Sequence, residues 1–148
     1  MTAAGTVRIH RRNAAPASDQ ERWGRATFEV RQTSSTRVVV AVVGDIDAVN
    51  ARALGRYVEK HIRVSKQLML DLRAVDFMGS QAFTALYYID VHCGRGDVDW
   101  IIVGSHPVRR LLSICDPDGE LPVVEDLQTG LSRLDRLAHC HYHAAPTG

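Results

Sequence analysis

Residues 37–43 read RVVVAVV, and this β-branched run is the feature that most limits what the chain can fold into. A strand with one face in water alternates apolar and polar residues, whereas this run has no polar residue after Arg37. The run therefore predicts a strand buried on both faces, as in sheets that carry helices on each side. It ends at Gly44, where a turn is expected.

Shorter apolar segments alternate with helical patterns along the rest of the chain. Further strands are expected at residues 27–32, 67–72, 98–103 and 121–124. Helices are expected at residues 49–62 and 80–92, and from residues 106 and 126 onward. This alternation predicts an α/β fold, in which a mixed, mainly parallel sheet of about four to five strands is covered by about four helices.

The charges are unevenly distributed, although the whole chain carries a net charge of +1. Residues 1–25 contain five arginines and two acids and lack apolar periodicity, which predicts a flexible basic leader. We expect one domain over residues 26–138 and a second flexible tail over residues 139–148. The small net charge argues against nucleic acid as a direct partner.

The sequence predicts neither a membrane span nor a secretory signal. Its longest apolar run, residues 38–43, is far shorter than the roughly 20 residues of a spanning helix. The N-terminus lacks the apolar core of a signal peptide. Three widely spaced cysteines do not resemble a disulfide framework. These features predict a cytoplasmic protein with reduced thiols.

Ser80 is the residue most open to a chemical interpretation, because it stands between a predicted strand and a predicted helix. Its hydroxyl could cap the helix, accept a phosphate at the helix N-terminus, or act as a nucleophile. A hydrolase elbow needs glycine at the positions that Met78 and Ala82 occupy. We therefore rank capping first, modification second and a small hydrolase last. Asp47 is expected to cap the helix that begins near Val49.

The cysteines and histidines supply metal ligands, but their positions favour other interpretations. The HCHYH stretch at residues 139–143 lies in an expected tail, with no second layer of groups to orient ligands. We expect neither a metal nor another cofactor. Cys93 and Cys115 end two predicted helices and are expected to fill core space. A redox pair between these two cysteines stays open.

The predicted helix at residues 80–92 is apolar around most of its circumference, and Phe83 and Tyr87 share one side of it. A single packing face cannot bury so many apolar side chains. A second layer, a dimer contact or a partner protein must cover the surplus. This surplus is the strongest local indication of a binding surface.

Two motifs resemble signatures of the STAS domain family. Residues 44–47 read GDID and precede AVNARAL, which is similar to the family's Gly-x-Leu/Ile-Asp opening. Residues 70–86 read LDLRAVDFMGSQAFTAL, which resembles its second signature, a strand followed by Asp-Ser-Ser-Gly and a helix. Together the motifs resemble the bacterial anti-sigma factor antagonist branch over about residues 26–138. The resemblance implies a binding module rather than an enzyme, which sequesters an anti-sigma factor, often a kinase-fold protein, and so frees a sigma factor.

The resemblance also implies a switch, in which the kinase phosphorylates a serine of the Asp-Ser-Ser-Gly turn. Here Gly79 takes the place of the aspartate, Ser80 that of the first serine, Gln81 that of the usual acceptor and Ala82 that of the glycine. Glutamine cannot accept a phosphate, so Ser80 remains the phosphorylation candidate, and the switch is expected to be atypical or absent. The partner-contacting positions that the resemblance implies are Asp47, Gly79, Ser80, Gln81 and Ala82, and the apolar surplus of the predicted helix adds Phe83 and Tyr87 to them.

Two alternatives within the family stay open at this point. The chain could be the STAS subunit of a lipid-transport or signalling assembly, or an antagonist regulated by redox chemistry at Cys93 and Cys115. Homodimerisation is also left open by the sequence.

Overall fold

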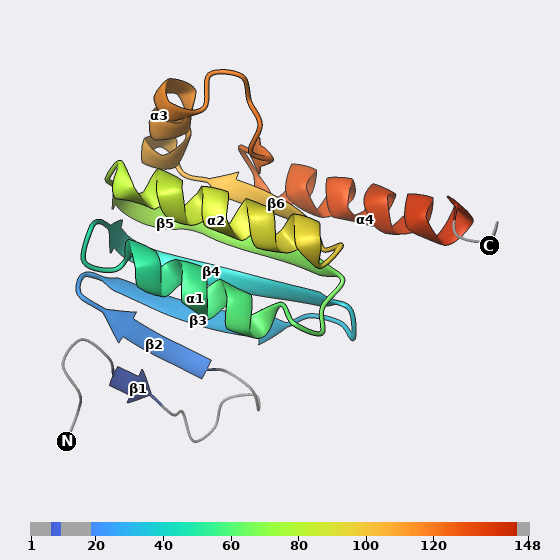
Figure 1. Cartoon of the computed structure of the whole chain (residues 1–148), viewed down its shortest axis with the longest axis horizontal. Helices are drawn as coiled ribbons and strands as arrows, with labels where there is room; N and C mark the ends of the chain where they lie inside the picture. Colours follow the sequence, from blue (N-terminus) through green and yellow to red (C-terminus); the bar gives the residue numbers. More distant parts are fainter. Residues whose placement is uncertain (1–6, 10–18, 145–148) are drawn as a thin grey trace.

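In the computed structural model, which describes residues 7–9 and 19–144, β4 and β5 lie near the middle of a mixed sheet of seven strands (Figure 1). Four helices pack on this sheet in the described part of the chain. The elements, in chain order, are β1 (Val7–Ile9), β2 (Asp19–Trp23), β3 (Ala26–Gln32), β4 (Arg37–Ile46), α1 (Ala51–His61), β5 (Gln67–Met78), α2 (Gln81–Arg95), β6 (Asp99–Gly104), α3 (His106–Cys115), β7 (Val123–Val124) and α4 (Leu127–Ala144).

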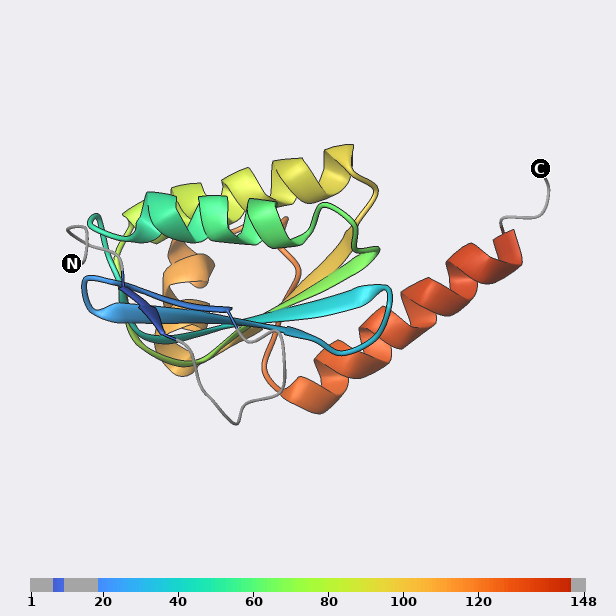
Figure 2. The same cartoon turned by 90° about the horizontal axis from the view of Figure 1, so that it is seen from below.

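The strands lie in the sheet in the same order as in the sequence. The first four strands form an antiparallel meander, and β4, β5, β6 and β7 are parallel to one another. Helices α1 and α2 cover one face, and α4 runs under the other face and past the edge of the sheet (Figure 2). The expected mixed, mainly parallel α/β architecture with four helices is confirmed, with seven strands instead of four to five.

Both additional strands fall in residues 1–25, which the sequence predicts to be a flexible leader, so that prediction is wrong for β1 and β2. Strand β2 pairs with β3, and Trp23 packs against the main core. The Tyr57 hydroxyl on α1 donates a hydrogen bond to the carbonyl of Asp19. The contact with Tyr57 joins residues 38 positions apart in the chain, which local periodicity does not reveal. Residues 1–6 and 10–18 of the expected leader lie outside the described residues.

The expected tail at residues 139–148 is also corrected in part, because α4 continues to Ala144. Leu134 on its inner side belongs to a small second core of five buried side chains, in which the other four come from the sheet: Met69, Ile101, Val103 and Val124. A polar anchor adds to this contact. The buried Gln67 donates from Nε2 to the carbonyl of Leu134 at 2.7 Å and accepts from Nε of Arg37 at 2.9 Å. Residues 145–148 lie outside the described part of the chain.

Strand β4 is buried on one face along its length but on the other face only in part. Val38, Val40 and Val42 lie in the main core under the helices. On the opposite face α4 partly covers Val39, whereas Val43 is 56% exposed. The prediction of a strand buried on both faces is therefore wrong for the second half of β4, because α4 does not reach it.

The end of β4 depends on a close approach of two backbone segments. Gly44 has φ 109°, a left-handed conformation that favours glycine. A Cβ at this position would stand 2.0 Å from the carbonyl oxygen of Arg25, which accepts a hydrogen bond from Asp45 N–H at 3.1 Å. Glycine at position 44 therefore lets the start of β3 approach the end of β4.

Asn50, just before α1, fixes the loop that follows β4. Its side chain is completely buried. The amide Nδ2 donates to the carbonyls of Asp45 at 2.9 Å and Trp23 at 3.1 Å, and Oδ1 accepts from Asp47 N–H at 3.0 Å. A buried amide with these three bonds holds the loop against the end of β2.

Replacing Gly44 with alanine is expected to lower the free energy of unfolding by about 2 kcal/mol or more, because the added Cβ is strained and clashes with backbone. Urea denaturation measures the loss. Gly94→Ala is the matched control, since a Cβ on Gly94 within α2 meets nothing within 4 Å. Its expected effect is a gain of about 0.5–1 kcal/mol. Equal effects of the two substitutions would contradict the close-approach argument.

Asn50→Ala is expected to cost about 2–3 kcal/mol of unfolding free energy, because buried backbone groups lose their partners. Amide hydrogen exchange at Asp47 should accelerate as well, since its N–H loses the Oδ1 acceptor. The control is Gln128→Ala, which truncates an exposed amide on α4 and is expected to change stability by less than about 0.5 kcal/mol. If Asn50→Ala were as mild as this control, the anchoring role would be wrong.

Candidate partner-binding site

The parallel strands β4 and β5 end side by side, and their ends bring two of the predicted site segments together. Ile46 at the end of β4 pairs with Met78 at the end of β5. The pairing continues one step further, because Gly79 N–H donates to the carbonyl of Ile46 at 2.8 Å. We call residues 47–49 and 79–81, together with the neighbouring side chains of Phe77, Phe83 and Tyr87, the strand-end surface. Carboxyl ends of parallel strands are where α/β proteins most often place binding sites.

Asp47 shapes the first of these segments but does not cap α1. Its Oδ1 accepts from Val49 N–H at 3.0 Å, and its carbonyl accepts from Ala51 N–H at 2.9 Å. Helix α1 begins at Ala51, with Asn50 in the N-cap position. The predicted capping role of Asp47 is therefore replaced by a local turn that its carboxylate closes. Asn50, which secures this turn, was missed in the sequence, although an asparagine beside a helix start is a usable signal.

The second segment begins α2 and contains no charged side chain. Ser80 occupies the N-cap position, but its hydroxyl makes no capping hydrogen bond, so the preferred interpretation of Ser80 as a cap is wrong. The turn is closed by the backbone instead, through Ala82 N–H to the Gly79 carbonyl at 3.0 Å and Phe83 N–H to the Ser80 carbonyl at 3.1 Å. Both Ser80 and Gln81 are exposed.

Ala82 does not belong to the surface, in contrast to the prediction. Its side chain is completely buried in the main core, because the first turn of α2 faces the sheet at that position. The side chain of Gln81 lies across the turn instead. Its Oε1 would stand 3.2 Å from a Cβ placed on Gly79. Gly79, Ser80 and Gln81 are thus the members of the turn that reach solvent.

Aromatic side chains border the turn on both sides. On α2, the rings of Phe83 and Tyr87 stack with centroids 6.4 Å apart, and Tyr87 is 51% exposed. Phe77, near the end of β5, is 53% exposed, and its ring lies 3.5 Å from the position of a Cβ on Gly79. Phe77 was missed as a surface residue because the sequence places it inside a strand pattern. An uncharged turn between exposed aromatic rings suits protein binding.

A serine nucleophile needs a nearby base such as a histidine, and His61 and His92 both lie away from Ser80. His61 is the last residue of α1 and approaches Asp19, with Nε2 and Oδ2 3.6 Å apart. His92 lies near the end of α2 and approaches Glu59, with Nδ1 and Oε2 3.9 Å apart. Ser80 stands at the opposite end of α2. Neither His61 nor His92 is therefore placed to act as a base for Ser80.

Cys93 and Cys115 are not brought together. Cys93 lies near the end of α2, whereas α3, which ends at Cys115, lies beside the beginning of α2 (Figure 1). Burial, and to a lesser extent the charge of Asp90, raises the pKa of the Cys93 thiol to about 12. Such a thiol is protonated at neutral pH and reacts slowly.

Within residues 7–9 and 19–144, no group of three or more histidine, cysteine or acidic side chains is placed to hold a metal ion. None of the helices in the described part of the chain combines the length and hydropathy that a transmembrane segment requires.

Comparison with solved structures finds anti-sigma factor antagonists. An anti-sigma factor antagonist from Mycobacterium paratuberculosis is 27% identical, with a TM-score of 0.64 and coverage of 81% of this chain and 97% of that chain. SpoIIAA, an anti-sigma factor antagonist in its unphosphorylated form, is 13% identical, with a TM-score of 0.60 and coverage of 76% and 96%. An RsbS variant from Moorella thermoacetica is 19% identical, with a TM-score of 0.62 and coverage of 74% and 96%. The last two are likenesses of fold.

No curated protein sequence matches the chain. The model of the STAS domain family, in contrast, matches residues 27–130, from the start of β3 into α4. This range includes the strand-end surface and the two motifs that resemble the family. The chain therefore belongs to the STAS domain family.

Proposed function

We propose that this protein is an anti-sigma factor antagonist, a cytoplasmic binding module that sequesters an anti-sigma factor and so frees a sigma factor. The observation that carries the proposal is the strand-end surface, where Gly79 N–H of an uncharged turn donates to the carbonyl of Ile46 and so holds the turn beside the loop that begins at Asp47. The similarity to the mycobacterial antagonist supports the same class of function. A surface of this kind binds rather than catalyses, because it offers contact area without a reactive pair.

The exposed aromatic rings give the surface its affinity in this proposal. Phe77 and Tyr87 are each about half exposed, so a partner that covers them removes apolar area from water. Aromatic residues are common among those that dominate binding energy at protein interfaces. The turn between them adds backbone and amide groups that can hydrogen-bond without an ion pair. A kinase-fold anti-sigma factor is the partner that the family resemblance implies.

The phosphorylation switch is absent in this proposal, because Gln81 stands where the resemblance places the usual acceptor. The exposed hydroxyl of Ser80 lies one residue earlier. A phosphate on Ser80 would be tolerated by the fold, since a helix N-terminus favours negative charge. It would oppose docking, however, because it places charge on an apolar contact surface. We therefore propose an antagonist that is competent without dephosphorylation.

Substitutions on the strand-end surface are expected to weaken binding to the cognate anti-sigma factor at least about tenfold. Gln81→Arg adds a charge to the turn, and Tyr87→Asp adds one beside the stacked rings. Phe83→Asp is a third variant, to be used where circular dichroism shows that it folds. The controls Gln128→Arg and Val64→Asp introduce the same charges at exposed positions elsewhere. Isothermal titration calorimetry with each purified anti-sigma factor of the host measures the affinities.

The proposal fails if folded Gln81→Arg and Tyr87→Asp variants bind as tightly as wild type and the controls. It also fails if none of the host's anti-sigma factors binds the wild-type chain. A loss in the surface variants that the controls do not share supports the assigned surface.

Phosphorylation is tested separately, with the cognate kinase, ATP and intact-mass spectrometry. Wild type is expected to gain no phosphate, whereas Gln81→Ser is expected to gain one, because it restores a hydroxyl at the acceptor position. The double variant Ser80→Ala with Gln81→Ser should still be modified, which assigns the phosphate to position 81. Phosphate on Ser80 of the wild-type chain would show that the switch has moved rather than disappeared.

A further inference from the structure

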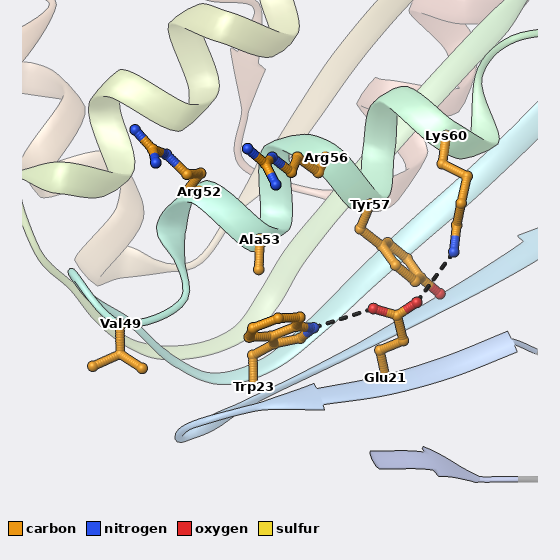
Figure 3. Close-up of a pocket in the computed structure, with 8 residues that line it drawn as sticks. All are labelled: Glu21, Trp23, Val49, Arg52, Ala53, Arg56, Tyr57 and Lys60. Atoms are coloured by element: carbon orange, nitrogen blue, oxygen red, sulfur yellow. Dashed lines mark hydrogen bonds and ion pairs between the residues drawn. The ribbon is translucent and has the colours of Figure 1, made fainter. Parts of the chain in front are cut away.

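A hollow of about 300 Å³ lies between α1 and β2, on the side of α1 away from α2 (Figures 1 and 3). This volume is at the small end of the range for ligand-binding pockets. Two of the lining residues, Glu21 and Trp23, come from β2 and precede the part of the chain that the family model matches. The full lining is Glu21, Trp23, Val49, Arg52, Ala53, Arg56, Tyr57 and Lys60. We call this hollow the α1–β2 groove.

The floor of the groove is held in place by its own polar contacts. Trp23 Nε1 donates to one carboxylate oxygen of Glu21 at 3.1 Å, and Lys60 Nζ donates to the other at 3.2 Å (Figure 3). Tyr57 is buried, and its hydroxyl is bonded to the carbonyl of Asp19. The negative charge of Glu21 is therefore balanced by Lys60, and the rings of Trp23 and Tyr57 form an ordered apolar wall.

The rim of the groove carries three positively charged side chains, of which only Lys60 forms an ion pair among the described residues. Arg52, Arg56 and Lys60 are each four residues apart and so lie along one side of α1. Lys60 pairs with Glu21, but neither arginine takes part in any ion pair shown among the described residues. Both arginine side chains are exposed. Like charges at this spacing destabilise a helix slightly. The charge of Arg56 is offset in part by Glu59, whose pKa is lowered by the Tyr88 hydroxyl and, to a smaller extent, by nearby positive charges that include Arg56.

We infer that the α1–β2 groove binds an acidic segment of a protein partner, with carboxylates on Arg52 and Arg56 and an apolar side chain in the hollow against Trp23. The guanidinium group suits this role, because it binds a carboxylate through two parallel hydrogen bonds. Arg52 and Arg56 lie about 6 Å apart along the helix, at 1.5 Å per residue. That length matches about two residues of extended peptide, so carboxylates two positions apart would face the two arginines.

Charge and shape favour an acidic peptide over other anions. A nucleic acid would bring phosphates onto Glu21 and onto a chain with a net charge of +1. A row of cations beside an apolar hollow instead matches a segment that alternates carboxylates with an apolar side chain. The inference does not depend on the proposed antagonist function, because only Val49 of the groove residues also belongs to the strand-end surface, and neither Arg52 nor Arg56 does.

The test uses fluorescence anisotropy with a labelled oligoglutamate that carries one central leucine, and the same peptide with glycine in place of leucine. Neutralising the rim in the double variant Arg52→Gln, Arg56→Gln is expected to weaken binding of the leucine peptide about five- to tenfold. The matched control neutralises two exposed arginines on α3 and α4, in Arg110→Gln with Arg136→Gln, and should change affinity less than about twofold. Wild-type affinity should also fall as salt is added.

The hollow is tested by filling it without changing the charge. The side chain of Ala53 points toward Trp23 (Figure 3), so Ala53→Met is expected to reduce binding of the leucine peptide to the level of the glycine peptide. Circular dichroism and thermal unfolding confirm that each variant folds. The rim variant is therefore expected to bind the leucine peptide more weakly than wild type. The Ala53→Met variant is expected to bind the leucine and glycine peptides with equal affinity.

Three results would overturn the inference. The first is equal loss of peptide affinity in the rim variant and in its control, and the second is equal binding of the leucine and glycine peptides by wild type. The third is evidence for a different occupant of the groove. Such evidence would be a short RNA that binds more tightly than the peptide through the same arginines, or self-association of the wild-type chain that sedimentation shows to be lost in the rim variant. Loss of anti-sigma factor binding in the strand-end variants alone would leave this inference untouched.

Discussion

The parallel pairing of β4 with β5 is the interaction on which the rest of the structure depends. Its register brings Ile46 opposite Met78, and the two shifts along the ladder let both strands end at the same level. Gly79 N–H then bonds to the Ile46 carbonyl, so the loop after β4 and the turn after β5 become neighbours. A slip of one residue would turn the core face of β5 toward the opposite side of the sheet. The buried leucines of β5, Leu68, Leu70 and Leu72, therefore fix the strand-end surface as well as the core.

Two buried side-chain amides, those of Gln67 and Asn50, hold α4 and the loop after β4 in place. Gln67 ties α4 to the start of β4 and β5, and Asn50 ties the loop after β4 to the end of β2. Each amide satisfies backbone groups that would otherwise be buried without partners, which makes each one specific for its position. Their partners are remote in the chain, 67 residues away for Gln67 and Leu134 and 27 for Asn50 and Trp23.

That remoteness explains which parts of the structure could be predicted from the sequence. Local periodicity predicted the helices and strands from β3 onward, whereas the position of the Asp47 loop beside the turn at Gly79 follows from the pairing of β4 with β5. Strand β2 escaped prediction because its stabilising partners, Tyr57 and Lys60, lie on α1. The exposure of Phe77 and the burial of Ala82 depend on how β5 and α2 meet, which a one-dimensional pattern does not contain. The open half of β4 likewise depends on where α4 passes.

Asn50 joins the strand-end surface to the α1–β2 groove. Its amide bonds at once to Asp45, at the beginning of the loop, and to Trp23, in the wall of the groove. Val49, which lines the groove, lies between Asp47 and Asn50 in the same loop. A partner that contacted the neutral turn and the basic rim together would therefore meet one preorganised surface. Because little backbone would need to be ordered on binding, more of the contact energy would remain as affinity.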